Sequence, residues 1–117
     1  MTYISPEVQR RIEELFKVSK GAIESIIVTK PDGTPTAYVN LKKIHPDFLA
    51  AAVSSVAGVL SSILETLELG YFKRLHVELE DKRFIFVVPL GSDVVAITTK
   101  PSPNVGFIDL LIDLYLK

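Results

Sequence analysis

The chain has few side chains suited to acid–base or nucleophilic chemistry, and their spacing matches no catalytic pattern. His45 precedes a predicted helix and His76 lies on the polar side of a predicted strand, and neither belongs to a metal-ligand spacing or a nucleophile–base motif. Asp109 and Asp113 are four residues apart without a histidine or further carboxylates nearby, which makes a poor cation site. We therefore interpret the two histidines as surface or interface residues.

Serine and glycine motifs also fail to indicate an enzyme. The serines between positions 54 and 62 follow one predicted helix and lack the G-x-S-x-G turn that exposes a nucleophile. Pro31-Asp32-Gly33 is typical of a hairpin turn and lacks the further glycines, Lys-Ser/Thr pair or acidic partners of a phosphate or calcium loop. Because the chain has no cysteine, disulfides, thiol catalysis and cysteine zinc sites are excluded. The sequence predicts a protein that is not an enzyme and has no cofactor or metal site.

Size and charge point to one small domain without a strong electrostatic partner. The 117 residues suit a single domain spanning residues 1–117, and no linker interrupts them. Thirteen basic and 14 acidic residues give a net charge of −1, so no global field favours nucleic acid. The start of the chain has no apolar run behind basic residues, so we expect no secretory signal and a cytoplasmic protein.

Hydrophobic periodicity and turn residues predict the order αββαβββα. Ser5-Pro6 and Ser102-Pro103 each have the form of a helix start, with a capping hydroxyl before a proline. Alternating or continuous apolar runs predict the strands, and Gly70 is a suitable stop for the middle helix. The predicted strands are residues 23–29, 36–41, 74–80, 84–90 and 94–99, and the middle helix is residues 46–70.

The middle helix is unusual because neither of its faces carries charge over most of its length. At about 100° per residue, one stripe of large apolar side chains is predicted to face the core. The opposite stripe is made of small residues, and no charge occurs between Asp47 and Glu65. We interpret the small stripe as a dimer seam, since small residues let two backbones approach closely. The core stripe is Leu49, Val53, Val56, Leu60, Ile63, Leu64 and Leu67, and the small stripe is Ala51, Ser55, Gly58 and Ser62.

The same helix is also compatible with two different environments. A helix that is apolar all round is typical of one buried inside its own domain. A membrane span is the second alternative, but the uncharged run from Phe48 to Leu64 is shorter than the roughly 20 residues that a bilayer requires. It also has no lysine or arginine immediately beside it. We therefore predict no membrane insertion.

Several short motifs, in this order, resemble the roadblock/dynein light chain family. They are Ile23-Glu24-Ser25 before an apolar strand, Asp32-Gly33 in the hairpin, residues 49–52 opening the long helix, Leu69-Gly70, Pro89-Leu90-Gly91 and Asn104-Val105-Gly106. The resemblance covers nearly the whole chain. This chain departs from the family at Ser25, where a glycine is frequent, and at Thr29-Lys30, where an aspartate often occurs.

The resemblance implies an α+β sandwich of profilin-like architecture. Its five-stranded antiparallel sheet would carry the long helix on one face and the two terminal helices on the other. Family members dimerise through the long helix and the strand after it, which joins two sheets into one. Mapped onto this chain, the implied dimer interface contains Ala51, Ser54, Ser55, Gly58, Ser62, Glu65, Arg74, His76, Glu78 and Glu80.

Charge along the strand 74–80 is self-complementary, which supports such a joint. Antiparallel pairing of two copies about Val77 places Arg74 opposite Glu80 and His76 opposite Glu78. Pairing about His76 instead places Arg74 opposite Glu78, so both registers remain open.

In function, the resemblance implies a non-catalytic adaptor. The family contains regulators or scaffolds of small Ras-like GTPases and light chains of motor complexes. We expect a homodimer that binds a small GTPase, a GTPase-containing complex or a second roadblock protein. Two alternatives remain: a structural assembly module, and a sensor that binds a small ligand in a pocket between sheet and helix.

Overall fold

The structure, a computed structural model, describes residues 5–42 and 45–116 and consists of one sheet between two helical layers. The ends of the predicted domain, residues 1–4 and 117, lie outside the described residues. The sheet is fully antiparallel with the strand order β2-β1-β5-β4-β3. The predicted α+β architecture is confirmed. The helices are α1 (Pro6–Val18), α2 (Pro46–Thr66) and α3 (Val105–Tyr115), and the strands are β1 (Ile23–Thr29), β2 (Pro35–Val39), β3 (Leu75–Glu78), β4 (Phe84–Leu90) and β5 (Asp93–Thr99).

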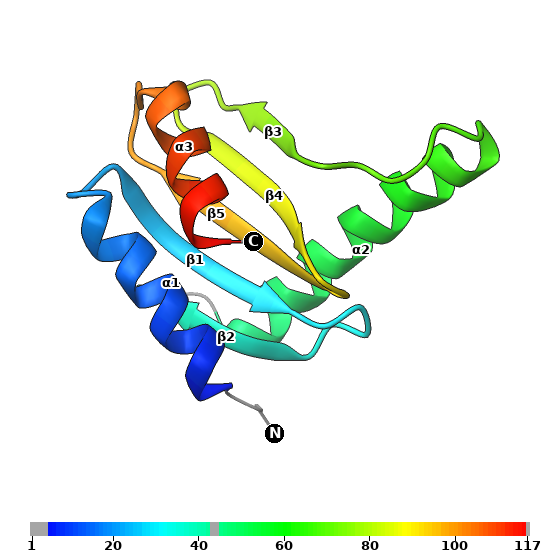
Figure 1. Cartoon of the computed structure of the whole chain (residues 1–117), viewed down its shortest axis with the longest axis horizontal. Coiled ribbons are helices and arrows are strands. Elements are labelled where there is room, and N and C mark those ends of the chain that lie inside the picture. Colours follow the sequence, from blue (N-terminus) through cyan, green and yellow to red (C-terminus); the bar gives the residue numbers. More distant parts are fainter. Residues whose placement is uncertain (1–4, 43–44, 117) are drawn as a thin grey trace.

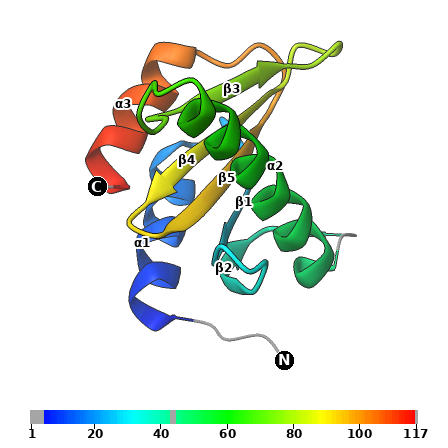
Figure 2. The same ribbon diagram turned by 90° about the vertical axis from the view of Figure 1, so that its right-hand side faces the viewer.

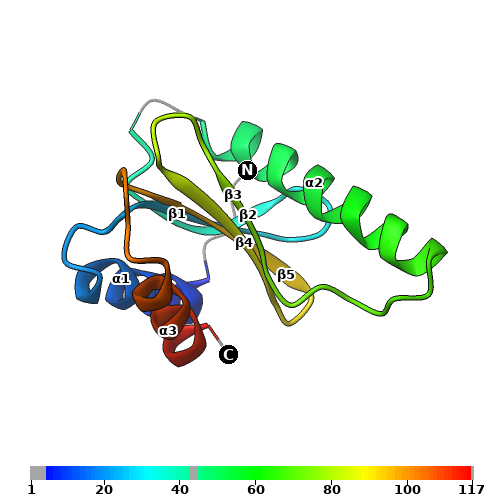
Figure 3. The same cartoon turned by 90° about the horizontal axis from the view of Figure 1, so that it is seen from above.

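The helices divide between the two faces of the sheet as expected. α1 and α3 lie together on one face, and α2 crosses the other (Figure 3). Under α1 and α3, the side chains of Ile12, Phe86 and Ile108 are fully buried in the larger core cluster. Under α2, a smaller cluster includes Ile27 and Val53. Each inner strand therefore supplies both cores from alternate residues.

Local signals explain most element boundaries. The Ser5 hydroxyl accepts a hydrogen bond from the Val8 amide at the start of α1. In the β1–β2 hairpin, the Gly33 amide donates to the Lys30 carbonyl over 2.9 Å, and Gly33 has φ +90°. That closed turn matches the one predicted from Pro31-Asp32-Gly33.

Two helix boundaries differ from the prediction. α3 starts at Val105 rather than after Ser102, because the Asn104 side chain accepts from the Phe107 amide over 3.0 Å and Ser102 has φ +54°. α2 ends at Thr66, well before Gly70.

The end of α2 explains why Gly70 is not its stop. The Glu68 amide donates to the Glu65 carbonyl, and the Leu69 amide donates to the Leu64 carbonyl. This pair of hydrogen bonds defines a Schellman motif. Glu68 takes the left-handed conformation at φ +56°, so a glutamate occupies the position that usually requires glycine.

α2 extends past the sheet at its carboxyl end. It packs on β1, β2 and β5. Its last turns, and the segment leading to β3, stand clear of the strands (Figure 1). Figure 2 looks onto α2 as it crosses the sheet diagonally. The helix therefore presents most of its circumference to its surroundings, and its outward surface is the first place to look for a functional site.

Candidate interaction surface

The face of α2 that contacts the sheet is made of small residues. Ala50, Val53 and Ala57 are buried there, which lets the helix lie close to β1 and β5. The predicted core stripe is therefore partly wrong. Val53 is buried, but Val56, Ile63 and Leu67 are exposed. Val56 and Ile63 lie on the uncovered flank of the helix. Because this flank is also apolar, hydrophobic periodicity cannot distinguish it from the buried face.

The uncovered flank forms one continuous apolar surface, which we call the apolar flank of α2: Ala52, Val56, Val59 and Ile63. At about 100° per residue these four side chains fall on one side of the helix. Val59 is 62% exposed and Ile63 50% exposed. A shallow hollow of about 380 Å³ lies along this side and is lined by Ser55, Val56, Val59, Leu60 and Ile63.

The small-residue stripe occupies a different side of α2. Ala51, Ser55 and Gly58 are exposed, and Ser62 lies one turn after Gly58 on the same side. Part of the stripe is explained by packing within the chain, because a Cβ atom built on Gly33 would lie 3.2 Å from the Cα atom of Ala51. Gly58 has no such neighbour within 4 Å.

The other α2 residues predicted for the dimer interface offer few free polar groups to a partner. Ser54 is half-buried and Ser55 is exposed, and both hydroxyls donate to the Ala51 carbonyl of their own helix. Glu65 is exposed in the last turn. The outward side of α2 is thus short of free polar groups.

The β3 edge is open along its outer side. β3 pairs with β4 only, from Leu75 opposite Val87 to Glu78 opposite Phe84. The Leu79 amide donates to the Arg83 carbonyl over 2.8 Å. Bonding to the neighbour alternates along an antiparallel strand, so the backbone groups of His76 and Glu78 point away from β4.

β3 is shorter than the predicted strand 74–80. Arg74 lies just before its first residue, and Glu80 lies in the turn after it. Arg74 is held by its own chain: its guanidinium contacts Asp109 at 2.9 Å and Asp113 at 2.6 Å, both on α3. His76 lies edge-on against the rings of Phe84 and Phe86.

The aspartates that looked unsuited to a cation site therefore bind an arginine. Burial acts to lower the pKa of Arg74, but hydrogen bonds to Asp113 and Asp109 outweigh it and the net pKa is raised. Two like charges at i, i+4 repel each other, so their spacing could have indicated a nearby cation, although it does not identify Arg74 as that cation.

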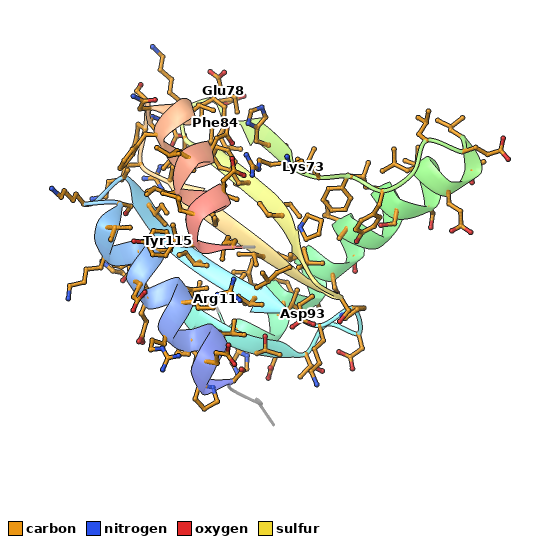
Figure 4. The ribbon with its side chains drawn as sticks, in the orientation of Figure 1. Arg11, Lys73, Glu78, Phe84, Asp93 and Tyr115 are labelled. Carbon is orange, nitrogen blue, oxygen red and sulfur yellow. The ribbon has the colours of Figure 1, made fainter. Side chains whose placement is uncertain are left out.

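Figure 4 shows Arg11 of α1 beside Tyr115 of α3, where the Arg11 side chain donates to the Tyr115 carbonyl over 3.0 Å.

α2 also has the dimensions of a membrane-spanning helix. Within residues 5–42 and 45–116, it is the one helix long and apolar enough, by length and composition alone, to cross a bilayer. The uncharged run from Phe48 to Leu64 underestimates the length of this helix, which has 21 residues. It packs on β1, β2 and β5, but only 17% of its apolar length is buried within the chain. The same described residues contain no group of three or more histidine, aspartate or glutamate side chains placed to hold a metal ion.

Comparison with known proteins agrees with this geometry. The model of the Roadblock/LC7 domain matches residues 11–99, which is most of the chain. The chain belongs to the Roadblock/LC7 family. No curated protein matches it in sequence.

Solved structures share the roadblock fold at low sequence identity. Myxococcus xanthus MglB is 13% identical, with a TM-score of 0.86 over 94% of this chain and 89% of that one. A Roadblock/LC7 domain from Streptomyces avermitilis is 18% identical, with a TM-score of 0.73 over 81% and 80% of the two chains. Acanthamoeba castellanii profilin IB, at 12% identity, has a TM-score of 0.51 over 83% and 84%. These similarities concern the fold alone. The similarity to profilin IB supports the predicted profilin-like architecture.

Proposed function

We propose that this roadblock protein is a non-catalytic homodimeric adaptor that binds a small Ras-like GTPase or a complex containing one. The observation that carries the proposal is the apolar flank of α2, which lies on the side of the helix nearest the open β3 edge. Ala52 and Val56 of the flank line the same cavity as Leu75 and Val77 of β3. An exposed apolar surface beside an unpaired strand is typical of an interface and, without a partner, is an aggregation hazard.

In the proposed dimer, β3 pairs with its own copy and the two apolar flanks meet over the joined sheet. The outward backbone groups of His76 and Glu78 are available for that pairing. The register about Val77 is preferred, because it places His76 of one copy opposite Glu78 of the other. Since Arg74 is held by Asp109 and Asp113, the pair with Glu80 predicted from sequence contributes less than its charges suggest.

The geometry favours the apolar flank over the small-residue stripe as the helical part of the seam. The stripe of Ala51, Ser55, Gly58 and Ser62 then stays on the outer surface of the paired helices. We assign the docking of the GTPase to this outer surface. Its small side chains allow the close approach of another backbone, and recognition there needs no acid, base or nucleophile from this chain.

A pair of arginine substitutions tests where the seam lies. Val59→Arg introduces a charge into the apolar flank and is expected to yield monomers in light scattering. Gly58→Arg introduces the same charge one residue away, in open space, and is expected to keep the dimer but lose the GTPase. If Gly58→Arg is monomeric while Val59→Arg remains dimeric, the proposed seam is wrong and the small-residue stripe forms the dimer interface.

The GTPase itself is tested by co-elution. Candidate Ras-like GTPases from the same genome are loaded with GDP or with a non-hydrolysable GTP analogue and mixed with the protein. Binding to one nucleotide state indicates regulation, because a partner that prefers one state shifts its population. Equal binding to both states favours the alternative of a structural scaffold. We also propose, on the basis of this function, that the protein acts in the cytoplasm.

A further inference from the structure

Two adjoining cavities lie on the α2 face of the sheet. The inner cavity has a volume of about 280 Å³ and lies between α2 and the sheet. Its walls are apolar and include Val53 of α2, Val87 of β4 and Ala96 of β5. Ligand pockets in proteins typically combine such apolar walls with a few polar groups at one end.

The outer cavity opens at the end of the sheet where β1 and β4 begin. It has a volume of about 580 Å³ and shares the lining residues Ser25, Ile85 and Thr98 with the inner cavity, so the two spaces adjoin at these side chains. The hydroxyls of Ser25 and Thr98 are hydrogen-bonded to each other at this junction. The two adjoining cavities therefore offer an apolar part and a more polar part.

The rim of the outer cavity carries an excess of positive charge. Its acidic residue is Glu24, whose carboxylate lies 2.7 Å from the guanidinium of Arg83. Lys42 and Lys100 also line the cavity. In the described part of the chain, neither lysine has an ion pair. Two ammonium groups are thus available to an anion at the polar end.

A hydrogen bond between Asn40 and β1 holds one side of the rim in place. The Asn40 side chain donates to the Glu24 carbonyl over 2.6 Å, and Asn40 is held at φ +58°. Asparagine adopts this left-handed conformation more readily than most residues, so the backbone here carries little strain. The bond fixes the segment before Lys42 against β1, which gives the rim a defined shape.

We propose that this two-part cavity binds a medium-chain carboxylate of the fatty acid type. The alkyl chain occupies the inner cavity, and the carboxylate reaches the rim that carries Lys42 and Lys100. Charge complementarity selects this ligand, because the rim offers cations without carboxylate partners while the interior offers apolar walls. The site is separate from the outer surface assigned to the GTPase, but its inner cavity is also lined by Ala52, Val56 and Val77, which lie along the proposed dimer seam.

Calorimetric titration with sodium dodecanoate tests the proposal. One molecule is expected to bind per chain, whereas dodecanol, with the same chain and no charge, binds more weakly. Lys42→Gln combined with Lys100→Gln should weaken dodecanoate binding about tenfold, the contribution of a charge-assisted hydrogen bond. Lys17→Gln combined with Lys20→Gln removes the same charge near the end of α1 and should leave binding unchanged.

A second variant tests the apolar end. Ile85→Phe adds volume where the two cavities meet and is expected to abolish binding while circular dichroism stays unchanged. The proposal is overturned if dodecanoate does not bind, if dodecanol binds as tightly, or if the lysine variant binds like the wild type. Repeating the titration on Val59→Arg separates the two proposals: dodecanoate binding should persist in that variant, and its loss would mean that the second copy builds the site.

Discussion

The guanidinium of Arg74 lies 2.6 Å from the carboxylate of Asp113 and joins the beginning of the β3 edge strand to α3. Asp109 binds the same guanidinium from one turn earlier. β3 is one of the two edge strands and has a sheet neighbour on one side only, so this clamp supplies a second attachment for it. The position of the proposed dimer joint therefore depends on the helix on the opposite face of the sheet.

Removal of the clamp should destabilise the domain modestly. For Arg74→Gln we expect a loss of about 1 kcal/mol in the free energy of unfolding, because the pair is partly exposed and screened by solvent. Urea denaturation measures this loss, and raising the salt concentration should reduce the difference from the wild type. Arg10→Gln, on the exposed side of α1, is the control and should change stability little. An equal effect of both variants would contradict a structural role for the clamp.

The open edge of β3 can be blocked without disturbing β4. Because the Glu78 amide points away from β4, Glu78→Pro removes a hydrogen-bond donor from the edge only. We expect monomers in light scattering with nearly wild-type secondary structure.

Val77→Pro is the matched comparison for the edge variant. It removes a donor that bonds to β4 and should unfold the edge of the sheet. Dimers that survive Glu78→Pro would contradict pairing through β3.

Close packing between the β1–β2 hairpin and α2 makes Gly33 sensitive to any side chain. Gly33→Ala would place a Cβ atom 3.2 Å from the Cα atom of Ala51, at φ +90°. Gly21 has the same φ with nothing within 4 Å, so Gly21→Ala isolates the backbone cost of about 1 kcal/mol. Thermal unfolding should show a larger loss for Gly33→Ala, by about 1 kcal/mol or more. Equal losses would mean that the hairpin moves away from α2 freely.

The left-handed glutamate after α2 offers a stabilising substitution. Glu68→Gly should raise the free energy of unfolding by about 0.5 to 1 kcal/mol, since glycine adopts this conformation without steric cost. Glu68→Ala removes the same charge and keeps the strain, so denaturation of this control should show little gain. A similar gain in both variants would assign the effect to charge near the helix end.

The hairpin also predicts a pH effect at Asp32. Hydrogen bonds from Thr34, side chain first and then backbone, lower the pKa of Asp32 from its ordinary 3.8. Because the folded-state pKa is lowered, the stabilisation is present above the unfolded pKa and disappears as pH falls through the folded one. Carbon NMR titration should give a midpoint below 3.8 for Asp32. Thr34→Ala keeps the backbone bond and should raise that midpoint, and no change would exclude the hydroxyl as a cause.

Local chemistry explains why so much of the fold was predictable from the sequence. Ser5 before Pro6 starts α1, Pro31-Asp32-Gly33 closes the hairpin, and the apolar run at 84–90 becomes an inner strand, each through interactions between near neighbours. The uncharged length of α2 was also visible as a pattern. These features depend on backbone preferences and on apolar periodicity, both of which are written along the chain.

The tertiary structure alone decided how α2 is rotated on the sheet. Large apolar residues lie on a flank and small ones on the buried face, so Ala50 and Ala57 are covered while Val59 and Ile63 are exposed. Close approach of the helix to β1 and β5 selects small residues, and periodicity cannot reveal that choice. The pairing of Arg74 with Asp113 joins residues 39 positions apart. Such a contact depends on the packing of α3 against the sheet, which no local pattern specifies.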